Sequence, residues 1–246
     1  MNLATELDEA SEKLQTSPMF SASLGGKELF HSNILAWMCR VYPKVAIPAL
    51  TGETATEGLF VIAAAEAERD ENPGESDDQQ GATQSAPTEI SFHGGPSDAA
   101  NDTSLRILRE FRHIDLLIQA SDGSRRYVIE NKFKSTPDAA QLIEYAGKMR
   151  DLGHSTLILL CADSLEGLDA VNTANKRLHD TPLRWECRSY ETMLDRLERA
   201  KGLIACEFHR ALLTDYVQST MVLLGLTHKF RHIHDRIAIA EADPAR

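Results

Sequence analysis

Three side chains near the middle of the 246-residue chain have the types and the spacing for metal-dependent chemistry. Asp115 lies in one stretch of aliphatic and β-branched residues, and Glu130 and Lys132 lie in the next one. Converging carboxylates can hold a divalent cation, because hard cations take carboxylate oxygens as ligands. A lysine beside that cation could stabilise charge that develops on a phosphoryl group, or assist a water nucleophile.

A β-hairpin is predicted to bring these three side chains together. Residues 114–118 and 126–133 read as its two strands, and Asp122-Gly123 between them suits a two-residue turn. That turn places Asp115 directly opposite Glu130. Because side chains alternate along a strand, the two carboxylates and the lysine then share one face.

The opposed carboxylates should repel each other and destabilise the hairpin, so a compensating charge is expected. A divalent cation is the candidate that we favour. An ordinary salt-bridged surface would have the same residues, and a shift of register would separate the two acids; the residues alone leave these alternatives open. The other face is predicted to be a core face of six side chains: Ile114, Leu116, Ile118, Tyr127, Ile129 and Phe133.

The net charge of −11 argues at first against a nucleic-acid partner. Much of that charge lies in residues 64–103, a stretch rich in Ser, Gly, Pro and acids that reads as a flexible insertion. Residues 105–134, by contrast, carry more basic than acidic side chains, Arg112 among them. A basic patch beside the carboxylates suits phosphate binding, although a charged strand edge would have the same composition.

The residues around the hairpin resemble the motif of the PD-(D/E)xK nuclease superfamily, which has the restriction-endonuclease-like fold. Asp115 is followed by Glu130-Asn131-Lys132 at the end of the next predicted strand, so the E-x-K element matches in full. Ile114 stands where the family name has proline. The resemblance extends over roughly residues 24–162.

Two further motifs support this resemblance. Gln141 and Tyr145 match the Q-x-x-x-Y motif of the RecB-like and lambda-exonuclease-like branches. Residues 28–37 are similar to the N-terminal helix of an uncharacterised subfamily of these nucleases. Each motif is short, and their order along the chain makes the set more specific than any one of them.

The resemblance implies a role for each matching residue. Asp115 and Glu130 would hold Mg²⁺ or Mn²⁺ together with the backbone carbonyl of Asn131, and Lys132 would act on the scissile phosphate or on the attacking water. In this family an acidic residue on the N-terminal helix, which residues 28–37 resemble, can approach the metal. Glu28 is therefore a further candidate ligand. An exposed carboxylate at a helix start is the alternative for Glu28.

Gln141, Tyr145, His31 and Arg112 are the candidates for contacts with substrate. The resemblance implies that Gln141 and Tyr145 face the site. An exposed polar stripe on a helix is the alternative for this pair, and a partly buried histidine is the alternative for His31.

The fold expected from the chain is α/β, a restriction-endonuclease-like mixed sheet flanked by helices on both faces. Strands are predicted at residues 105–111, 155–161 and 184–189 besides the hairpin. Helices are predicted at residues 2–15, 27–41, 53–68, 137–152, 190–201 and 206–224, with Gly25-Gly26 as a break and Thr136 as the cap before Pro137. Residues 1–246 form a single domain, in which residues 203–246 are a helical extension.

The expected function is a divalent-metal-dependent nuclease that acts on DNA rather than RNA. A defence effector against phage or mobile DNA is one form that such a nuclease could take. A catalytically inert nucleic-acid-binding or scaffold subunit of the same fold is the alternative. A homodimer and a separate regulatory or recognition protein are left open as partners. No membrane segment or signal peptide is recognised, and the four scattered cysteines favour reduced thiols in a cytoplasmic protein.

Overall fold

The computed structural model describes residues 3–53, 105–120, 123, 125–152 and 155–242. For residues 3–4, 25–28, 152 and 232–242 it describes the backbone alone. The predicted helix at residues 53–68, apart from Glu53, and the predicted acidic insertion at residues 64–103 lie outside the described residues.

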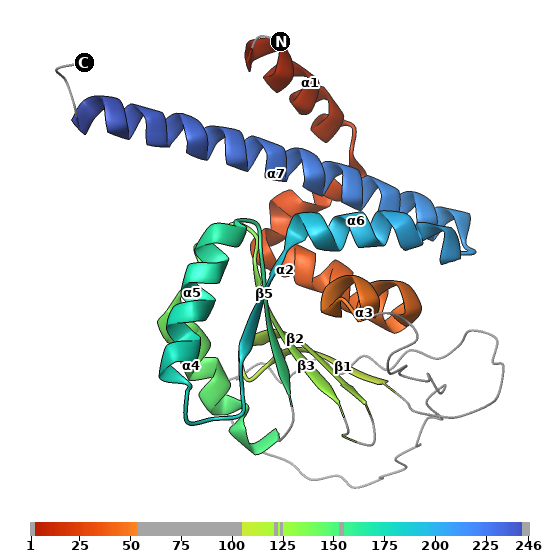
Figure 1. Cartoon of the computed structure of the whole chain (residues 1–246). Coiled ribbons are helices and arrows are strands. Elements are labelled where there is room, and N and C mark those ends of the chain that lie inside the picture. Colours follow the sequence, from red (N-terminus) through yellow and green to blue (C-terminus); the bar gives the residue numbers. More distant parts are fainter. Residues whose placement is uncertain (1–2, 54–104, 121–122, 124, 153–154, 243–246) are drawn as a thin grey trace, which may run out of the picture.

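A five-stranded mixed sheet forms the middle layer of the fold (Figure 1). The strands lie in the same order in space as in the chain. The first three pair antiparallel, and the last two join them in parallel. They are β1 (Leu105–Phe111), β2 (Ile114–Ala120), β3 (Arg126–Lys132), β4 (Thr156–Cys161) and β5 (Trp185–Ser189). The predicted α/β class and each of the predicted strands are therefore confirmed.

The β2–β3 hairpin has the predicted register over its described part. Leu116 pairs with Ile129, and the pairing continues in step toward the turn. At the turn, Gly123 has a φ of 70° and donates its N–H to the Ala120 carbonyl at 2.9 Å. A positive φ suits glycine, which is why the Asp-Gly pair marks the turn in the sequence.

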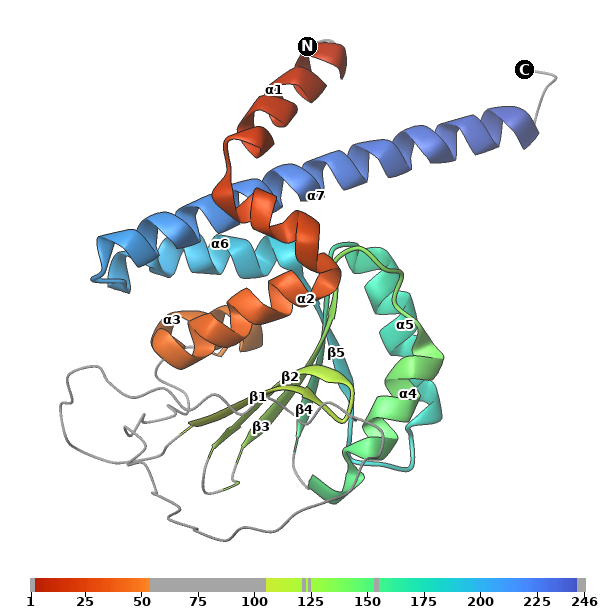
Figure 2. The same ribbon diagram turned by 180° about the vertical axis from the view of Figure 1, so that it is seen from behind.

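Helices cover both faces of this sheet (Figures 1 and 2). Helices α4 (Ala139–Lys148) and α5 (Ser164–Arg177) cover one face; α2 (Pro18–Val41), α3 (Pro43–Thr51) and α6 (Tyr190–Ala200) cover the other. Outside them lie α1 (Leu3–Gln15) and the long α7 (Glu207–Ala242), whose C-terminal part extends beyond the other elements. Neither α7 nor any other described helix is apolar enough over its length to span a membrane.

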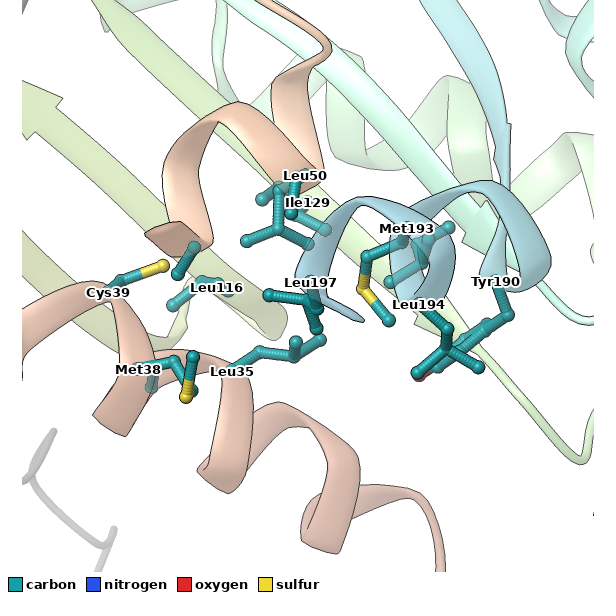
Figure 3. Close-up of a cluster of buried hydrophobic side chains, with 14 of the residues drawn as sticks. Leu35, Met38, Cys39, Leu50, Leu116, Ile129, Tyr190, Met193, Leu194 and Leu197 are labelled. Carbon is teal, nitrogen blue, oxygen red and sulfur yellow. The ribbon is translucent and has the colours of Figure 1, made fainter. Parts of the chain in front are cut away.

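Two apolar cores hold these layers together. In the first, Leu35 of α2, Leu50 of α3 and Leu197 of α6 pack against Leu116 and Ile129 of the hairpin (Figure 3). Burying each such side chain contributes roughly 1.5–3 kcal/mol. The second core joins α4 and α5 to the opposite face of the sheet, through side chains that include Leu117, Val128, Leu142, Leu157 and Val171.

The predicted core face is confirmed for five of its six side chains, which belong to the first core. Ile114 is the exception, because it packs in the second core on the other face. It directly follows Arg112 and His113, which both have positive φ and form the tight β1–β2 turn. The regular alternation of side chains along β2 therefore does not hold at its first residue, beside the turn.

Helices α4 and α5 cover the sheet face that carries Glu130, and Glu130 is buried. The alternative of an ordinary salt-bridged surface therefore does not describe this face.

Helix α2 passes through Gly25-Gly26, where a break was predicted. It begins at Pro18, about two and a half turns before the predicted start at residue 27. Ser17 caps it by accepting the Phe20 N–H at 2.9 Å, and Pro18 stands in its first turn. Two glycines cost a helix interior about 1 kcal/mol each relative to alanine. The packing of α2 in the first core outweighs this cost.

Other helix boundaries also differ from the predictions. Helix α4 begins after Asp138, whose carboxylate accepts the Ala140 N–H at 2.9 Å, so Asp138 and not Thr136 is the cap. Helix α7 continues to Ala242, beyond the predicted residue 224. Helices α3 and α5 were not predicted; α3 ends at Gly52, which has a φ of 73°.

Helix α5 approaches the sheet most closely at Gly167. A Cβ there would lie 2.3 Å from Cys161 Sγ and 2.7 Å from Cys187 Sγ. We expect Gly167→Ala to lower the free energy of unfolding by about 1–2 kcal/mol, because overpacking costs about 1–3 kcal/mol and outweighs the helix propensity of alanine. Denaturant unfolding measures this change.

Gly147 of α4 is the matched control, because a Cβ there meets no atom within 4 Å. Gly147→Ala is expected to raise the free energy of unfolding by up to about 1 kcal/mol. Equal effects of the two substitutions would contradict the close approach of α5 to the two sulfurs.

Candidate active site

The two candidate carboxylates lie at the same end of adjacent strands. Asp115 is the second residue of β2, and Glu130 and Lys132 are at the end of β3. Because β2 and β3 run antiparallel, the start of one lies beside the end of the other. The structure thus brings together the three side chains that the sequence singled out for chemistry.

Asp115 binds the backbone of β3 and is not a regular ladder partner of Glu130. Its Oδ2 accepts the N–H of Asn131 at 2.7 Å, and the β2–β3 pairing ends at Leu116 and Ile129. The repulsion between directly opposed carboxylates gives the physical reason for this local departure from regular pairing. The hydrogen bond fixes the Asp115 carboxylate beside the E-x-K segment.

Glu130 and Lys132 form a buried ion pair. Glu130 Oε1 lies 2.9 Å from Lys132 Nζ, and the two side chains are 4% and 11% exposed. Their spacing of two residues places them on one face of β3, as predicted. Lys132 thus supplies positive charge next to the carboxylates in a setting where water screens it little.

Helix α4 places Gln141 and Tyr145 on the same side of the sheet as this ion pair. Gln141 Nε2 donates to the Tyr145 hydroxyl at 2.7 Å. Burial is the main cause of a raised Tyr145 pKa; the Gln141 hydrogen bond and the Lys132 charge lower it, while the Glu130 charge raises it. Tyr145 therefore stays protonated at neutral pH.

Lys148, one turn beyond Tyr145, completes this polar side of α4. Its Nζ lies 5.1 Å from the centre of the Tyr145 ring and 2.7 Å from Glu144 Oε1. The cation over the ring face holds the tyrosine ring in place. The Q-x-x-x-Y pair is thus positioned by its own helix.

Arg112, a predicted substrate contact, lies on the exposed β1–β2 turn. Its guanidinium binds both carboxylate oxygens of Asp151, at 2.6 and 2.8 Å, and also the Lys148 carbonyl. A bidentate pair of this kind fixes the geometry of both partners. In this structure Arg112 ties the turn to the segment that follows α4.

His31, another predicted substrate contact, lies on the opposite side of the sheet. It is 1% exposed. The centre of its ring lies 4.1 Å from the centre of the Phe133 ring, and its Nδ1 lies 3.2 Å from the Tyr216 hydroxyl. The structure therefore does not bring His31 together with the carboxylates, and the buried-histidine alternative describes its setting. The side chain of Glu28 lies outside the described part of the chain.

Asn131 has a role that the sequence reasoning missed. Its side chain points away from the carboxylates, donating to Ser32 Oγ at 3.2 Å and accepting from the Tyr190 hydroxyl. It thereby ties β3 to α2 and α6 across the first core. An amide within a predicted core face was the available signal, because buried polar groups need hydrogen-bond partners.

Asn131→Ala is expected to lower the free energy of unfolding by about 2–4 kcal/mol. It removes two buried hydrogen bonds and leaves the Ser32 and Tyr190 hydroxyls to find other partners. Tyr190→Phe, which removes one of the two bonds, should cost about half as much. Thermal or denaturant unfolding measures both, and a neutral Asn131→Ala would contradict the bonding described.

A cavity of about 220 Å³ opens beside Lys132, and neither Asp115 nor Glu130 is among its lining residues. Lys132 lines it together with Lys134 and Ser135 of the following loop, Asp163 near α5 and Arg231 of α7. Arg231 is ion-paired with Asp163, which ties α7 to the start of α5.

The donor set suits a hard divalent cation. Asp115 and Glu130 offer carboxylate oxygens from adjacent strand ends, and a magnesium site commonly uses one or two carboxylates, with water and substrate oxygens completing the coordination. Among the described residues, no group of three or more His, Cys, Asp or Glu side chains comes together. Asp115, Glu130 and Glu28 therefore stay predicted metal ligands.

The fold and the site define a class of protein. Residues 19–218 match the model of the PD-(D/E)XK nuclease superfamily, and the chain belongs to that superfamily. Comparison with curated proteins and with solved structures gives no match.

Proposed function

We propose that this protein is a divalent-metal-dependent nuclease that hydrolyses phosphodiester bonds, with DNA as its expected substrate. The observation that carries the proposal is the meeting of Asp115, Glu130 and Lys132 at one end of the sheet. Membership of a nuclease superfamily supports it.

Each residue of the site has a definite part in this reaction. Asp115 and Glu130 would hold the cation, which when bound polarises the scissile phosphate and lowers the pKa of water. Lys132 stabilises the negative charge that builds on the phosphoryl oxygens as water attacks phosphorus and the P–O bond breaks. Its ion pair with Glu130 holds the ammonium in place before substrate arrives.

Tyr145 and Gln141 position the substrate. The Tyr145 hydroxyl already accepts a hydrogen bond from Gln141. Its own hydrogen is therefore directed elsewhere and can be donated to a phosphate oxygen. The raised pKa of Tyr145 keeps that hydrogen in place at neutral and mildly alkaline pH.

Incubation of the purified protein with plasmid, linear duplex, single-stranded DNA and RNA tests the proposal. Each substrate is combined with Mg²⁺, Mn²⁺ or EDTA. Lys132→Ala serves as the inactive control, and its circular dichroism is compared with that of the wild type because the substitution breaks the buried ion pair with Glu130. Cleavage that requires metal and is lost in the control is the expected result, and the substrate cut distinguishes DNA from RNA.

The absence of cleavage would favour the alternative of an inert nucleic-acid-binding subunit. A metal-dependent rise in melting temperature without cleavage would instead indicate a working metal site that awaits a partner. A role in defence is tested by comparing phage plating on cells that express the wild type or Lys132→Ala. Equal plating would contradict that role and leave the nuclease proposal intact.

A further inference from the structure

Two cysteine side chains lie against each other beneath helix α5. Cys161 is the last residue of β4, and Cys187 is the middle residue of the neighbouring β5. Their sulfur atoms are 3.4 Å apart, and both thiols are free. This distance is close to contact, so a small movement joins the two sulfurs.

The sheet and α5 together produce this approach. Leu159 pairs with Cys187 across β4 and β5, and Cys161 follows two residues later on the same face. Gly167 of α5 leaves the room for both sulfurs, because a Cβ there would overlap them. Any larger residue at this helix position would separate the two thiols.

The two thiols differ in exposure and in acidity. Cys161 is buried and Cys187 is partly exposed on the edge strand of the sheet. The hydrogen bond between the two thiols lowers the pKa of Cys187 and the Arg188 charge lowers it further, while burial raises it. The same hydrogen bond and burial raise the pKa of Cys161. Cys187 is therefore the thiol that more readily forms the reactive thiolate.

We propose that Cys161 and Cys187 form an oxidation site at which a peroxide generates an intramolecular disulfide. The Cys187 thiolate attacks one peroxide oxygen, the O–O bond breaks, and Cys187 becomes a sulfenic acid while hydroxide leaves. The Cys161 sulfur then attacks the Cys187 sulfur, and the S–O bond breaks with release of water. Overall, two thiols are oxidised and one peroxide is reduced to two waters.

The site can accommodate this change. The sulfurs must move from 3.4 Å apart to the bonded distance of about 2.05 Å. Cys161 stands at the end of its strand, and β5 has a strand neighbour on one side only. Because the strand register offsets Cys161 and Cys187 by two residues, closing the bond requires movement of both backbones. The competing explanation is an inert pair of thiols that packs as small apolar side chains.

Peroxide treatment of a Cys206→Ser chain tests the proposal, since the exposed Cys206 would otherwise form links between molecules. Hydrogen peroxide is added to the folded protein, remaining thiols are alkylated in denaturant, and intact mass and peptides are analysed. The expected result is a loss of two hydrogens, a Cys161–Cys187 linked peptide and one alkylated thiol, Cys39. A dithiol reductant should reverse all three changes.

Cys161→Ser is the diagnostic variant. It removes the resolving thiol, so peroxide should leave Cys187 as sulfenic or sulfinic acid without a link. Cys39→Ser, which alters a buried thiol in the first core, should form the same link as its parent. Continued alkylation of both Cys161 and Cys187 in the parent, or sulfinic acid on Cys187 in place of the link, would overturn the proposal.

A consequence for cleavage rests on the proposed function. Cys161 pairs with Lys132 across β3 and β4, and the Ala162 N–H binds the Lys132 carbonyl at 3.1 Å. Drawing Cys161 toward β5 should therefore displace Lys132 and slow cleavage, by up to about 100-fold for a displacement near 1 Å. Unchanged cleavage by the linked protein would refute this consequence, whereas inactivity of the reduced protein would count against the proposed function. The link is detected independently of either result.

Discussion

Glu130→Gln is expected to reduce phosphodiester cleavage by at least about 10³-fold while the protein stays folded. Glutamine has nearly the shape of glutamate, and its carbonyl can still accept a hydrogen bond from Lys132, 2.9 Å away in the wild type. It lacks the charge that a divalent cation needs from its ligand. Initial cleavage rates over a range of Mg²⁺ concentrations measure the effect.

Alanine is a poorer choice at this position. Glu130→Ala would leave the Lys132 ammonium, 11% exposed, without its carboxylate neighbour. Removing one partner of a buried ion pair lowers the free energy of unfolding by about 3–5 kcal/mol. A loss of activity in Glu130→Ala would therefore not separate a catalytic role from a loss of folding. Circular dichroism and a melting temperature near that of the wild type should accompany the Glu130→Gln result.

Glu144→Gln is the matched control. It makes the same charge change on α4, where Glu144 is 62% exposed and pairs with Lys148. An exposed pair contributes at most about 1 kcal/mol, and no part in catalysis is assigned to Glu144. Its cleavage rate should stay within about twofold of the wild type. Full activity of Glu130→Gln would remove Glu130 from the site.

The stability of the protein is expected to fall in acid, largely through His31. Burial lowers the pKa of His31 to about 3, and the charge of Lys134 lowers it further. Its Nδ1 lies beside the Tyr216 hydroxyl, and its Nε2 has no hydrogen-bond partner among the described residues. A proton on this ring would therefore be buried without compensation.

The direction of the effect follows from proton linkage. Between about pH 6.5 and pH 3 the unfolded chain binds a proton at His31 that the folded chain does not, so the free energy of unfolding falls as the pH falls. The shift corresponds to at most roughly 5 kcal/mol at the acid end, and to roughly 2–3 kcal/mol near pH 4.5. Urea unfolding at neutral and acid pH measures the loss.

His31→Gln isolates this contribution from those of other groups. The variant should be less stable at neutral pH, because its packing is poorer, but its stability should fall less steeply between pH 7 and about pH 4.5. His179→Gln is the control, since the His179 side chain is 70% exposed. Parallel pH profiles for the wild type and His31→Gln would show that His31 does not carry the effect.

The local pattern of the sequence determined the strands and the relation of the three reactive side chains. Apolar runs mark β2, β3 and β4, and the Asp122-Gly123 turn sets the register that pairs Leu116 with Ile129. A spacing of two residues is enough to put Glu130 and Lys132 on one face, because the strand has a period of two. These relations involve near neighbours in the chain, and residue types alone encode them.

The tertiary structure decided what surrounds those side chains. Packing outweighed the poor helix propensity of Gly25-Gly26, and a second helical layer buried the sheet face that carries Glu130. The burial of His31, the partners of Asn131 and the contact of Cys161 with Cys187 join segments that lie far apart in the chain. No local spacing encodes such contacts, because they depend on how whole elements pack against one another.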